Sequence, residues 1–416
     1  MEYTKCWLEY GKRCKNNKIK FAYIYMNGTS RVLDTCKMEL ELALNQLCQI
    51  QSEVVLSQTD TLADDTVQFS FLMDQNCERI EDGFDLSVKK HQVEIRAKND
   101  RGILYGVFEY IRRLQMVGEK DFEEVEYTVS KDPSNPLRMM NHWDNMDGSI
   151  ERGYSGNSFF FVDNEIVITE RVREYARMMA SIGINSSVIN NVNVKDCATY
   201  LITDKYLDKV KELSDIFNDY GVKLFLCVNF AAPIELHELD SADPLEPLVI
   251  EWWNKKVKEV YEKVPNLGGF LIKADSEGRK GPFTYNRTHA DGANMLAEAV
   301  EPYGGTIIWR CFVYNCQQDW RDKKTDRARS GYDNFVGLDG TFRDNVILQI
   351  KNGPMDFQVR EPIHPLFGGL EKTNQMLEVQ IAQEYTGQQR HICYLIPMFK
   401  EVLAFRTYVR DTYDTV

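Results

Sequence analysis

Charged side chains follow four consecutive apolar segments in the second half of the chain. The set consists of lysines, one arginine and carboxylates: Lys273, Asp275, Glu277, Arg310, Lys351, Asp356 and Glu384. Hydrolysis of a glycosidic bond needs one protonated carboxyl group for the leaving oxygen and an ionised one that acts as base or nucleophile. Cations beside them suit an acidic sugar, because an arginine can hold a carboxylate by two parallel hydrogen bonds. The residue types therefore favour hydrolysis of an acidic glycoside.

Two other interpretations of the same residues stay open. The charges could simply neutralise one another, which is the better interpretation for any single residue but not for a set that follows successive segments. Alternatively, Asp275, Asp356 and Glu384 could ligate magnesium in a lyase, since magnesium prefers oxygen ligands. The neighbouring lysines and arginine would repel a cation there. We therefore expect no metal ion and no cofactor.

The segment 137–156, LRMMNHWDNMDGSIERGYSG, is rich in side chains of the kind that contact sugars. Trp143 could stack on a sugar ring, and the asparagines and aspartates around it offer hydrogen bonds. The simpler interpretation is a solvated loop that one tryptophan anchors in the core. The segment is a second candidate for the substrate site.

Seven short apolar segments, each ending in polar or charged residues, carry these groups. They read LRMMNHWDN, SSVINN, KLFLCVNF, GFLIKADSE, TIIWRCF, VILQIK and MLEVQIAQE. Most are separated by segments with helical periodicity, and alternating strands and helices predict a parallel sheet. Because the polar residues gather at the carboxyl ends of the strands, the pattern predicts a β/α barrel with its active site at that end. Along the fourth segment, Lys273, Asp275 and Glu277 would share one face of a strand.

Three helices are predicted between these segments. The first begins after Thr169, which can cap it, and stops at Gly183. The second ends at Gly221 and the third at Pro265. Their apolar residues recur every three or four positions, which is typical of a face packed against a sheet.

Residues 1–130 differ from the rest and predict a small α+β domain. Its expected strands are 19–26, 66–73 and 91–98. Its expected helices are 37–48 and 101–117. The segment 131–137 contains two prolines and is the expected linker. The barrel would then occupy residues 131–416.

Composition narrows the class of function. The chain has 416 residues and a net charge of −13, which argues against nucleic acid as a partner. No segment is long and apolar enough to cross a membrane, and the N-terminus does not resemble a signal peptide. The ten cysteines form no CxxC pair. We therefore expect free thiols in a reducing cytoplasm.

Several motifs, taken in order, resemble those of the xylan-debranching α-glucuronidases, a family of glycoside hydrolases. They are NHWDNMDGSIERGYSG, YARMMASIGINSSVINNVN, FLIKADSEGRKGPFTYNRTHADGANML, FRDNVILQIKNGPMDFQVREPIHPLFG and QIAQEYTGQQ. The resemblance runs from about Leu137 to about Leu403. It implies an inverting hydrolase that removes glucuronic acid, or its 4-O-methyl ether, from xylo-oligosaccharides.

The resemblance also implies roles for individual residues. Glu277, in KADSEG, corresponds to the general acid. Asp356, in GPMDF, and Glu384, in AQEY, correspond to the carboxylates that activate water. The positions that hold the uronate carboxylate match Lys273, Arg310 and Lys351. The tryptophan near the O4 substituent of the sugar matches Trp143.

The end of the chain departs from the family pattern. Complete members continue through the last barrel strand into a helical C-terminal domain that carries the dimer contacts. Here the pattern stops after about Leu403, and no apolar run after 391–397 resembles another strand. We therefore expect a (β/α)8-type barrel without its eighth strand and without the family's dimer contacts. This leaves an alternative function: a catalytically silent fragment that at most binds acidic xylo-oligosaccharides.

Overall fold

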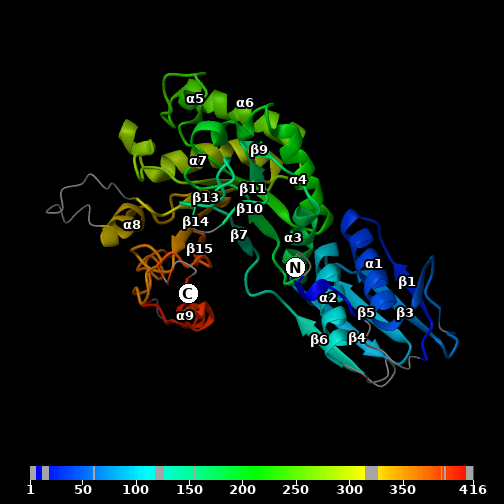
Figure 1. The fold of residues 1–416 in the computed structure, drawn as a ribbon. Helices are drawn as coiled ribbons and strands as arrows, with labels where there is room; N and C mark the ends of the chain where they lie inside the picture. Colours follow the sequence, from blue (N-terminus) through cyan, green and yellow to red (C-terminus); the bar gives the residue numbers. More distant parts are fainter. Residues whose placement is uncertain are drawn as a thin grey trace. The chain divides into compact units, whose positions relative to one another are not determined.

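The computed structural model describes residues 6–11, 18–59, 61–117, 126–153, 156–313, 327–385, 387, 390–408 and 416 (Figure 1). The chain divides into two compact units. The first comprises Met1–Met140, Ile168–Ser187 and Leu213–Lys223, and the second Asn141–Val167, Val188–Glu212 and Leu224–Val416. In the described part of the chain, no helix is both long and apolar enough to cross a membrane.

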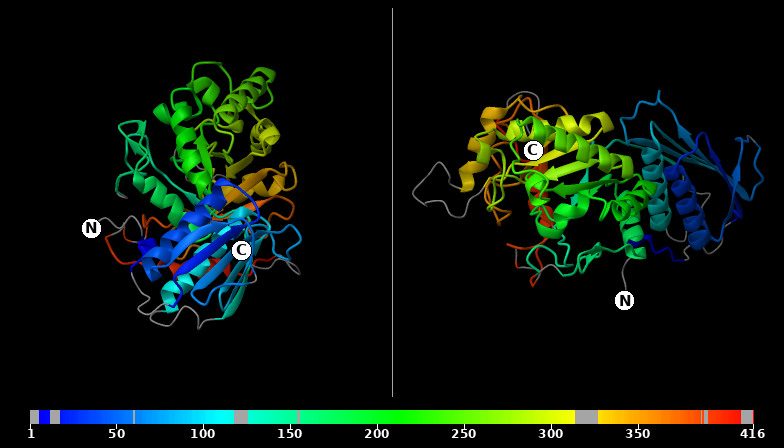
Figure 2. Two further views of the ribbon diagram at one scale, coloured as in Figure 1. Left: turned by 90° about the vertical axis from the view of Figure 1, so that its right-hand side faces the viewer. Right: turned by 90° about the horizontal axis from the view of Figure 1, so that it is seen from above.

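The first unit contains a six-stranded sheet with the order β2-β1-β3-β5-β4-β6. Its strands are β1 Phe21–Met26, β2 Gln51–Val55, β3 Thr66–Met73, β4 Phe84–Lys89, β5 Gln92–Ala97 and β6 Tyr127–Lys131. β1 pairs in parallel with β2 and β3, and β3 with β5, whereas β4 is antiparallel to both its neighbours. Helices α1 (Arg31–Ala43) and α2 (Asp100–Val117) pack against each other and cover one face (Figure 2).

The predicted strands 19–26, 66–73 and 91–98 correspond to β1, β3 and β5, and both predicted helices are present. A π-helical turn, η2 (Leu44–Cys48), completes the first helix. Three strands were not predicted. The edge strand β2 is largely exposed, so its sequence lacks the apolar alternation of a half-buried strand. In β4 that alternation is present, since every second residue from Phe84 is buried.

The second sheet has seven strands in the order β15-β14-β13-β12-β11-β10-β7. The strands are β7 Met139–Asn141, β10 Ser186–Val188, β11 Lys223–Val228, β12 Gly269–Ile272, β13 Thr306–Arg310, β14 Val346–Lys351 and β15 Gln375–Glu378. All seven predicted segments form strands, and each pair from β11 to β15 is parallel. The central strands are buried almost throughout, as expected of parallel strands covered on both faces.

The sheet is curled, so that its two end strands approach each other. The Asn141 side chain of β7 donates a hydrogen bond of 3.3 Å to Glu378 Oε1 of β15. In the described part of the chain, β7 pairs only with β10 and β15 only with β14. A curled α/β sheet with its strands in chain order agrees with the predicted fold class at this level.

The three helices predicted around this sheet are α3 (Glu170–Ser181), α4 (Leu207–Asp219) and α6 (Pro247–Lys263). Thr169 occupies the N-cap position of α3, as predicted, but its side chain makes no capping hydrogen bond. Gly183 and Gly221 adopt positive φ angles of 79° and 68° after α3 and α4. The other helical elements are η1 Cys6–Leu8, η4 Asp196–Ile202, α5 Ala232–Glu235, η5 Pro282–Tyr285, α7 His289–Val300, η6 Glu301–Tyr303, α8 Arg327–Phe335, η8 Val336–Leu338 and α9 Leu395–Leu403. A hairpin, β8 (Phe161–Val162) and β9 (Glu165–Ile166), completes the described elements.

Gly269 marks the start of β12, where the chain passes very close to β13. Its φ is +140°, and a Cβ atom there would lie 1.9 Å from the carbonyl oxygen of Thr306. A side chain would therefore push β12 away from β13. The glycine keeps these two strands, which lead to Lys273 and Arg310, in register.

The cysteines within the described residues are all free thiols, in agreement with the prediction. Cys36, Cys48, Cys77, Cys227 and Cys311 are buried. Burial raises the pKa of Cys36, Cys227 and Cys311 well above the ordinary value. These thiols therefore stay protonated and act as small apolar side chains.

Candidate active site

Four charged side chains stand at the carboxyl ends of neighbouring strands. Lys273 directly follows β12, while Arg310, Lys351 and Glu378 are the last residues of β13, β14 and β15. All four residues are between 2% and 8% exposed. Charges this deeply buried need partners, so the arrangement depends on how they pair with one another.

Each cation pairs with a carboxylate of the chain. Lys273 Nζ binds Glu277 Oε2 and also donates a bond of 2.8 Å to Asn193 Oδ1. Lys351 Nζ binds Asp356 Oδ1. The third pair, between Arg310 and Glu378, is described below. The site is thus charge-balanced without a ligand.

The three cations lie around one aromatic ring, that of Phe312. The charged groups of Lys273 and Arg310 lie 5.6 and 5.7 Å from its centroid, and Lys351 Nζ lies 3.4 Å from it. The ring stabilises cations over its face. The ends of the neighbouring strands place the three predicted uronate-binding residues around it. These residues are therefore near neighbours, as predicted.

The prediction that Lys273, Asp275 and Glu277 share one face of a strand is wrong. β12 ends at Ile272, and Asp275 and Glu277 adopt positive φ angles of 50° and 52° in the turn that follows. The turn brings Glu277 back to Lys273. It directs Asp275 elsewhere, where its carboxylate accepts a bond of 3.1 Å from Phe283 N–H.

The pKa values of the two carboxyl groups in this turn are shifted in opposite directions. Burial alone would raise the pKa of Glu277, but Lys273, Lys351 and Arg310 together bring it below its usual value. By contrast, burial raises the pKa of Asp275 to about 6, against a lowering effect of the Phe283 N–H. Glu277 is therefore ionised in this structure, and Asp275 is the carboxyl group that holds its proton more tightly.

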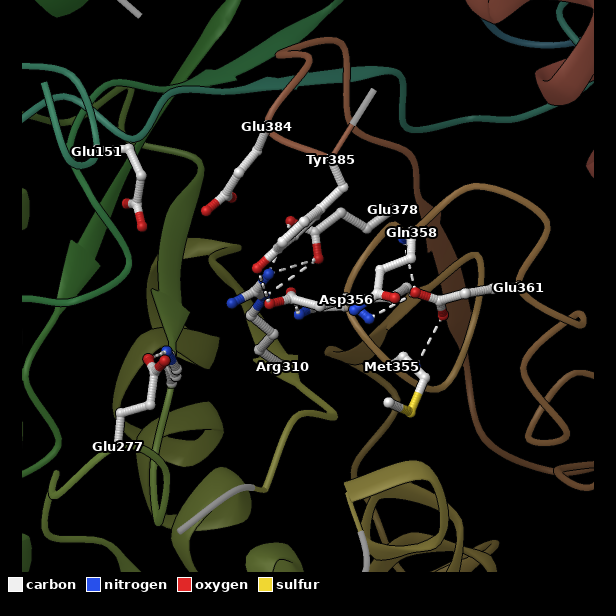
Figure 3. A network of polar contacts seen from close by, with 12 residues as sticks. Glu151, Glu277, Arg310, Met355, Asp356, Gln358, Glu361, Glu378, Glu384 and Tyr385 are labelled. Carbon is white, nitrogen blue, oxygen red and sulfur yellow. Dashed lines mark hydrogen bonds and ion pairs between the residues drawn. The ribbon is translucent and has the colours of Figure 1, made fainter. Parts of the chain in front are cut away.

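Asp356 stands in a loop after β14 and is held from two sides (Figure 3). One oxygen binds Lys351, and the other accepts a hydrogen bond of 3.0 Å from the Tyr385 hydroxyl. The backbone of its loop is bound by Glu361, which accepts bonds from the N–H groups of Met355, Asp356 and Gln358. Asp356 thus reaches the site with a defined position, as its predicted role requires.

Glu378 is a buried member of the site that the sequence did not reveal. Its carboxylate accepts bonds from Arg310 Nε and Nη2 at 3.1 and 3.0 Å. The guanidinium also lies over the Trp143 ring, 5.0 Å from its centroid. The signal was available: Glu378 is a charge within an apolar strand segment, a position that usually has a functional or pairing reason.

Glu384 lies beside two residues that were not predicted, Glu151 and Arg152. Its Oε1 binds Arg152 Nη1 at 3.2 Å, and Arg152 also contacts Glu151. Glu151 accepts a bond of 3.1 Å from Asn191. Glu151, Glu277 and Glu384 point into the same opening (Figure 3). Glu151 and Arg152 belong to the sugar-contact segment 137–156, which was the sequence signal for them.

A cavity of about 590 Å³ lies beside Glu277. Its wall offers amide, guanidinium and carboxylate groups from Asn145, Glu151, Arg152, Asn191, Asn193 and Arg279. No aromatic ring is among the described residues that line it. These groups can form hydrogen bonds with a polar ligand.

The carboxylates of the magnesium alternative do not converge. Asp275 binds Phe283 N–H, Asp356 binds Lys351, and Glu384 binds Arg152. Across the described residues, no group of three or more His, Cys, Asp or Glu side chains is arranged to hold a metal ion. The residues present therefore do not fit that alternative.

We expect binding of an acidic ligand to weaken as the pH rises through neutrality. Burial, together with the neighbouring charge of Arg310, lowers the pKa of Lys351 to about 7 and that of Lys273 to about 8. Above these values the lysines lose the charge that attracts a carboxylate, so the dissociation constant should increase. Calorimetric titration with an acidic and a neutral xylo-oligosaccharide between about pH 6 and pH 9 checks this. Equal pH dependence for both ligands would contradict it.

Comparison with known proteins gives two family matches. Residues 117–416 match the model of the glycosyl hydrolase family 67 middle domain, and residues 6–110 match that of the glycosyl hydrolase family 67 N-terminus. Among curated relatives, a probable alpha-glucuronidase A of Aspergillus flavus is 43% identical over 413 residues. An alpha-glucuronidase A of Emericella nidulans is 46% identical over 336 residues.

The matched regions cover most of this chain but at most about half of each relative. They include 96% and 79% of this chain but 48% and 39% of the Aspergillus flavus and Emericella nidulans proteins. The chain thus spans about half the length of these relatives, or less. Among solved structures, the GH20 beta-N-acetylhexosaminidase of Streptomyces coelicolor A3(2) has a TM-score of 0.51 at 12% identity, over 89% of this chain and 72% of that one. This likeness concerns the fold alone.

Proposed function

The chain belongs to glycosyl hydrolase family 67, and from this premise we propose that it releases glucuronic acid, or its 4-O-methyl ether, from xylo-oligosaccharides with inversion of the anomeric centre. The observation that carries the proposal is the convergence of Lys273, Arg310 and Lys351 around Phe312, beside carboxylates at the ends of successive strands. Three buried cations at one place suit a compact anion, which could replace their internal carboxylate partners. The relatives named alpha-glucuronidase support the same substrate class.

In this proposal the three cations bind the carboxylate of the uronic acid. Arginine can donate two parallel bonds to it, and the lysines add charge. Trp143, over which Arg310 lies, would form the wall near the O4 substituent of the sugar. The substrate carboxylate must then compete with Glu277, Asp356 and Glu378 for these cations.

This competition raises the pKa of Glu277, so that its carboxylate takes up a proton from the solvent. A general acid must be protonated, whereas Lys273 keeps Glu277 ionised in the free protein. When the uronate carboxylate takes over Lys273, Glu277 loses its cation and gains an anion nearby. Both changes raise its pKa, so the substrate itself converts Glu277 to an acid.

Asp356 and Glu384 are the proposed bases. The side chains of Glu277, Glu384 and Asp356 lie around one space, with Glu277 below it, Glu384 above it and Asp356 to its right (Figure 3). An inverting hydrolase needs about 6.5–9.5 Å between acid and base, which leaves room for the attacking water. The xylose residues of the leaving group would occupy the cavity beside Glu277, because the acid must touch the leaving oxygen.

We further propose that the curled sheet belongs to a (β/α)8-type barrel. The contact between Asn141 and Glu378 supports this, because it links the two end strands of the sheet. The division into a domain of residues 1–130 and a barrel of residues 131–416 belongs to the same proposal, as does a cytoplasmic location.

The proposal is tested by incubating the purified chain with an aldouronic acid and following the products by NMR. Release of the uronic acid, first as the anomer opposite to that of the bond cleaved, is the expected result. A folded chain that binds the oligosaccharide without cleaving it would instead favour the silent fragment. Size-exclusion chromatography on the same sample measures the oligomeric state.

A further inference from the structure

We propose that Glu361 is a positioning residue for catalysis, because its carboxylate fixes the loop from which Asp356 reaches the site. The inference rests on the proposed function of Asp356 as a base. Glu361 lies in one of the motifs that carry the family resemblance, but neither that resemblance nor the strand pattern gave it a role.

Glu361 binds the backbone of the loop at three points (Figure 3). Its Oε2 accepts a bond of 2.8 Å from Met355 N–H, and its Oε1 accepts bonds of 2.7 Å from the N–H groups of Asp356 and Gln358. Bonds to a charged acceptor are about twice as strong as bonds between neutral groups. One side chain thus anchors both the residue before Asp356 and the second residue after it.

The loop has no regular structure that would hold it otherwise. It follows β14 at Lys351 and contains Phe357 and Arg360 with positive φ angles of 60° and 61°. Such conformations are unfavourable for residues with side chains and persist only where the surroundings enforce them. The three bonds to Glu361 enforce the loop at the place where Asp356 stands.

Gly353 provides the space that this carboxylate occupies. A Cβ atom at position 353 would lie 2.2 Å from Glu361 Oε2. The close approach of Glu361 to the loop therefore depends on a glycine eight positions earlier in the chain. Loop and anchor fit each other, independently of the hydrogen bonds.

The position of Asp356 matters because a base must face the attacking water. A displacement of about 1 Å can reduce catalysis about 10²-fold, even when its origin lies away from the reacting atoms. Glu361 acts on Asp356 through its backbone N–H, whereas Lys351 and Tyr385 bind its carboxylate. Glu361 is thus expected to affect turnover more than substrate binding.

The test is the substitution Glu361→Gln, which preserves the size of the side chain. Glutamine offers one acceptor oxygen, and its NH2 group would face a backbone N–H instead of accepting from it. We expect kcat to fall about 10- to 100-fold with little change in KM. Amide hydrogen exchange of Met355, Asp356 and Gln358 should accelerate, and the melting temperature should show that the protein is folded.

Asp339 offers a matched control. Its carboxylate also holds a loop, accepting bonds from the N–H groups of Glu371 and Lys372 and from the Thr373 hydroxyl at 3.0, 3.1 and 2.8 Å. None of the proposed catalytic residues lies in that loop. Asp339→Asn should therefore accelerate exchange there and leave kcat unchanged.

The outcomes separate the inference from the proposed function. A wild-type kcat in Glu361→Gln, or an equal loss of kcat in Asp339→Asn, would overturn the positioning role. If Glu361→Gln does not fold, Glu361→Asp keeps both acceptor oxygens and should retain protection of the loop with a reduced kcat. If the wild-type chain releases no uronic acid, the proposed function fails; unchanged exchange of the three amides in Glu361→Gln would still overturn the anchor.

Discussion

Glu277→Gln is expected to reduce kcat by about 10²- to 10⁴-fold while substrate still binds, since general acid catalysis contributes rate enhancements of this size. Glutamine keeps the shape of the side chain but has no proton to give to the leaving oxygen. The substitution also removes the partner of Lys273, which becomes freer to bind the uronate. Single-turnover rates and calorimetric titration with an aldouronic acid measure the two effects separately.

Asp275→Asn is the matched control for this experiment. Asp275 lies in the same turn, and burial raises its pKa to about 6. It would be the alternative general acid if the pKa values in the free protein determined which carboxyl group donates the proton. Its carboxylate accepts a hydrogen bond from Phe283, which the amide oxygen of asparagine can also accept. We expect near wild-type turnover for Asp275→Asn. A large loss there, with activity kept in Glu277→Gln, would assign the acid to Asp275.

Arg310→Ala is expected to abolish detectable uronate binding and to destabilise the protein by about 3–5 kcal/mol, the usual effect of removing one partner of a buried ion pair. The arginine was predicted mainly as a ligand of the substrate carboxylate. In the structure it is 2% exposed and binds Glu378, which is itself 8% exposed. Its loss would leave the Glu378 carboxylate buried without its cation. Denaturant titration gives the free energy of unfolding.

The double substitution Arg310→Ala with Glu378→Ala separates stability from binding. Removing both charges eliminates the unpaired carboxylate, so the double variant should be more stable than Arg310→Ala alone. Neither variant should bind uronate detectably, because both lack the Arg310 guanidinium that binds its carboxylate. If stability were equal in the single and double variants, the pair would not be coupled as the geometry indicates.

Most of the strand framework could be predicted because buried parallel strands are short, apolar and bounded by polar residues. The same pattern indicated where Lys273, Arg310 and Lys351 would converge. Strand β2 could not be found in this way, because an exposed edge strand has no apolar periodicity. Strand alternation predicted that Lys273 and Glu277 share one face of a strand, but a turn with positive φ angles brings them together instead.

The unpredicted site residues share a physical reason. Glu378 pairs with Arg310 across two strands, and Arg152 bridges Glu151 and Glu384, residues more than 200 positions apart in the chain. Glu361 is recognisable only once the three backbone N–H groups that it binds are in view. Partners of this kind are set by the fold rather than by local spacing.

The pairing of every cation with a carboxylate of the chain also bears on how the site empties. Each cation that would bind the uronate has a carboxylate of the chain next to it: Glu277, Asp356 or Glu378. When the glycosidic bond is broken, these internal anions compete with the free sugar acid for the same positive charges. The product then lacks the contacts of the xylose residues, while its competitors remain attached to the protein. We expect product inhibition to be weak and departure of the sugar acid to be fast relative to bond cleavage.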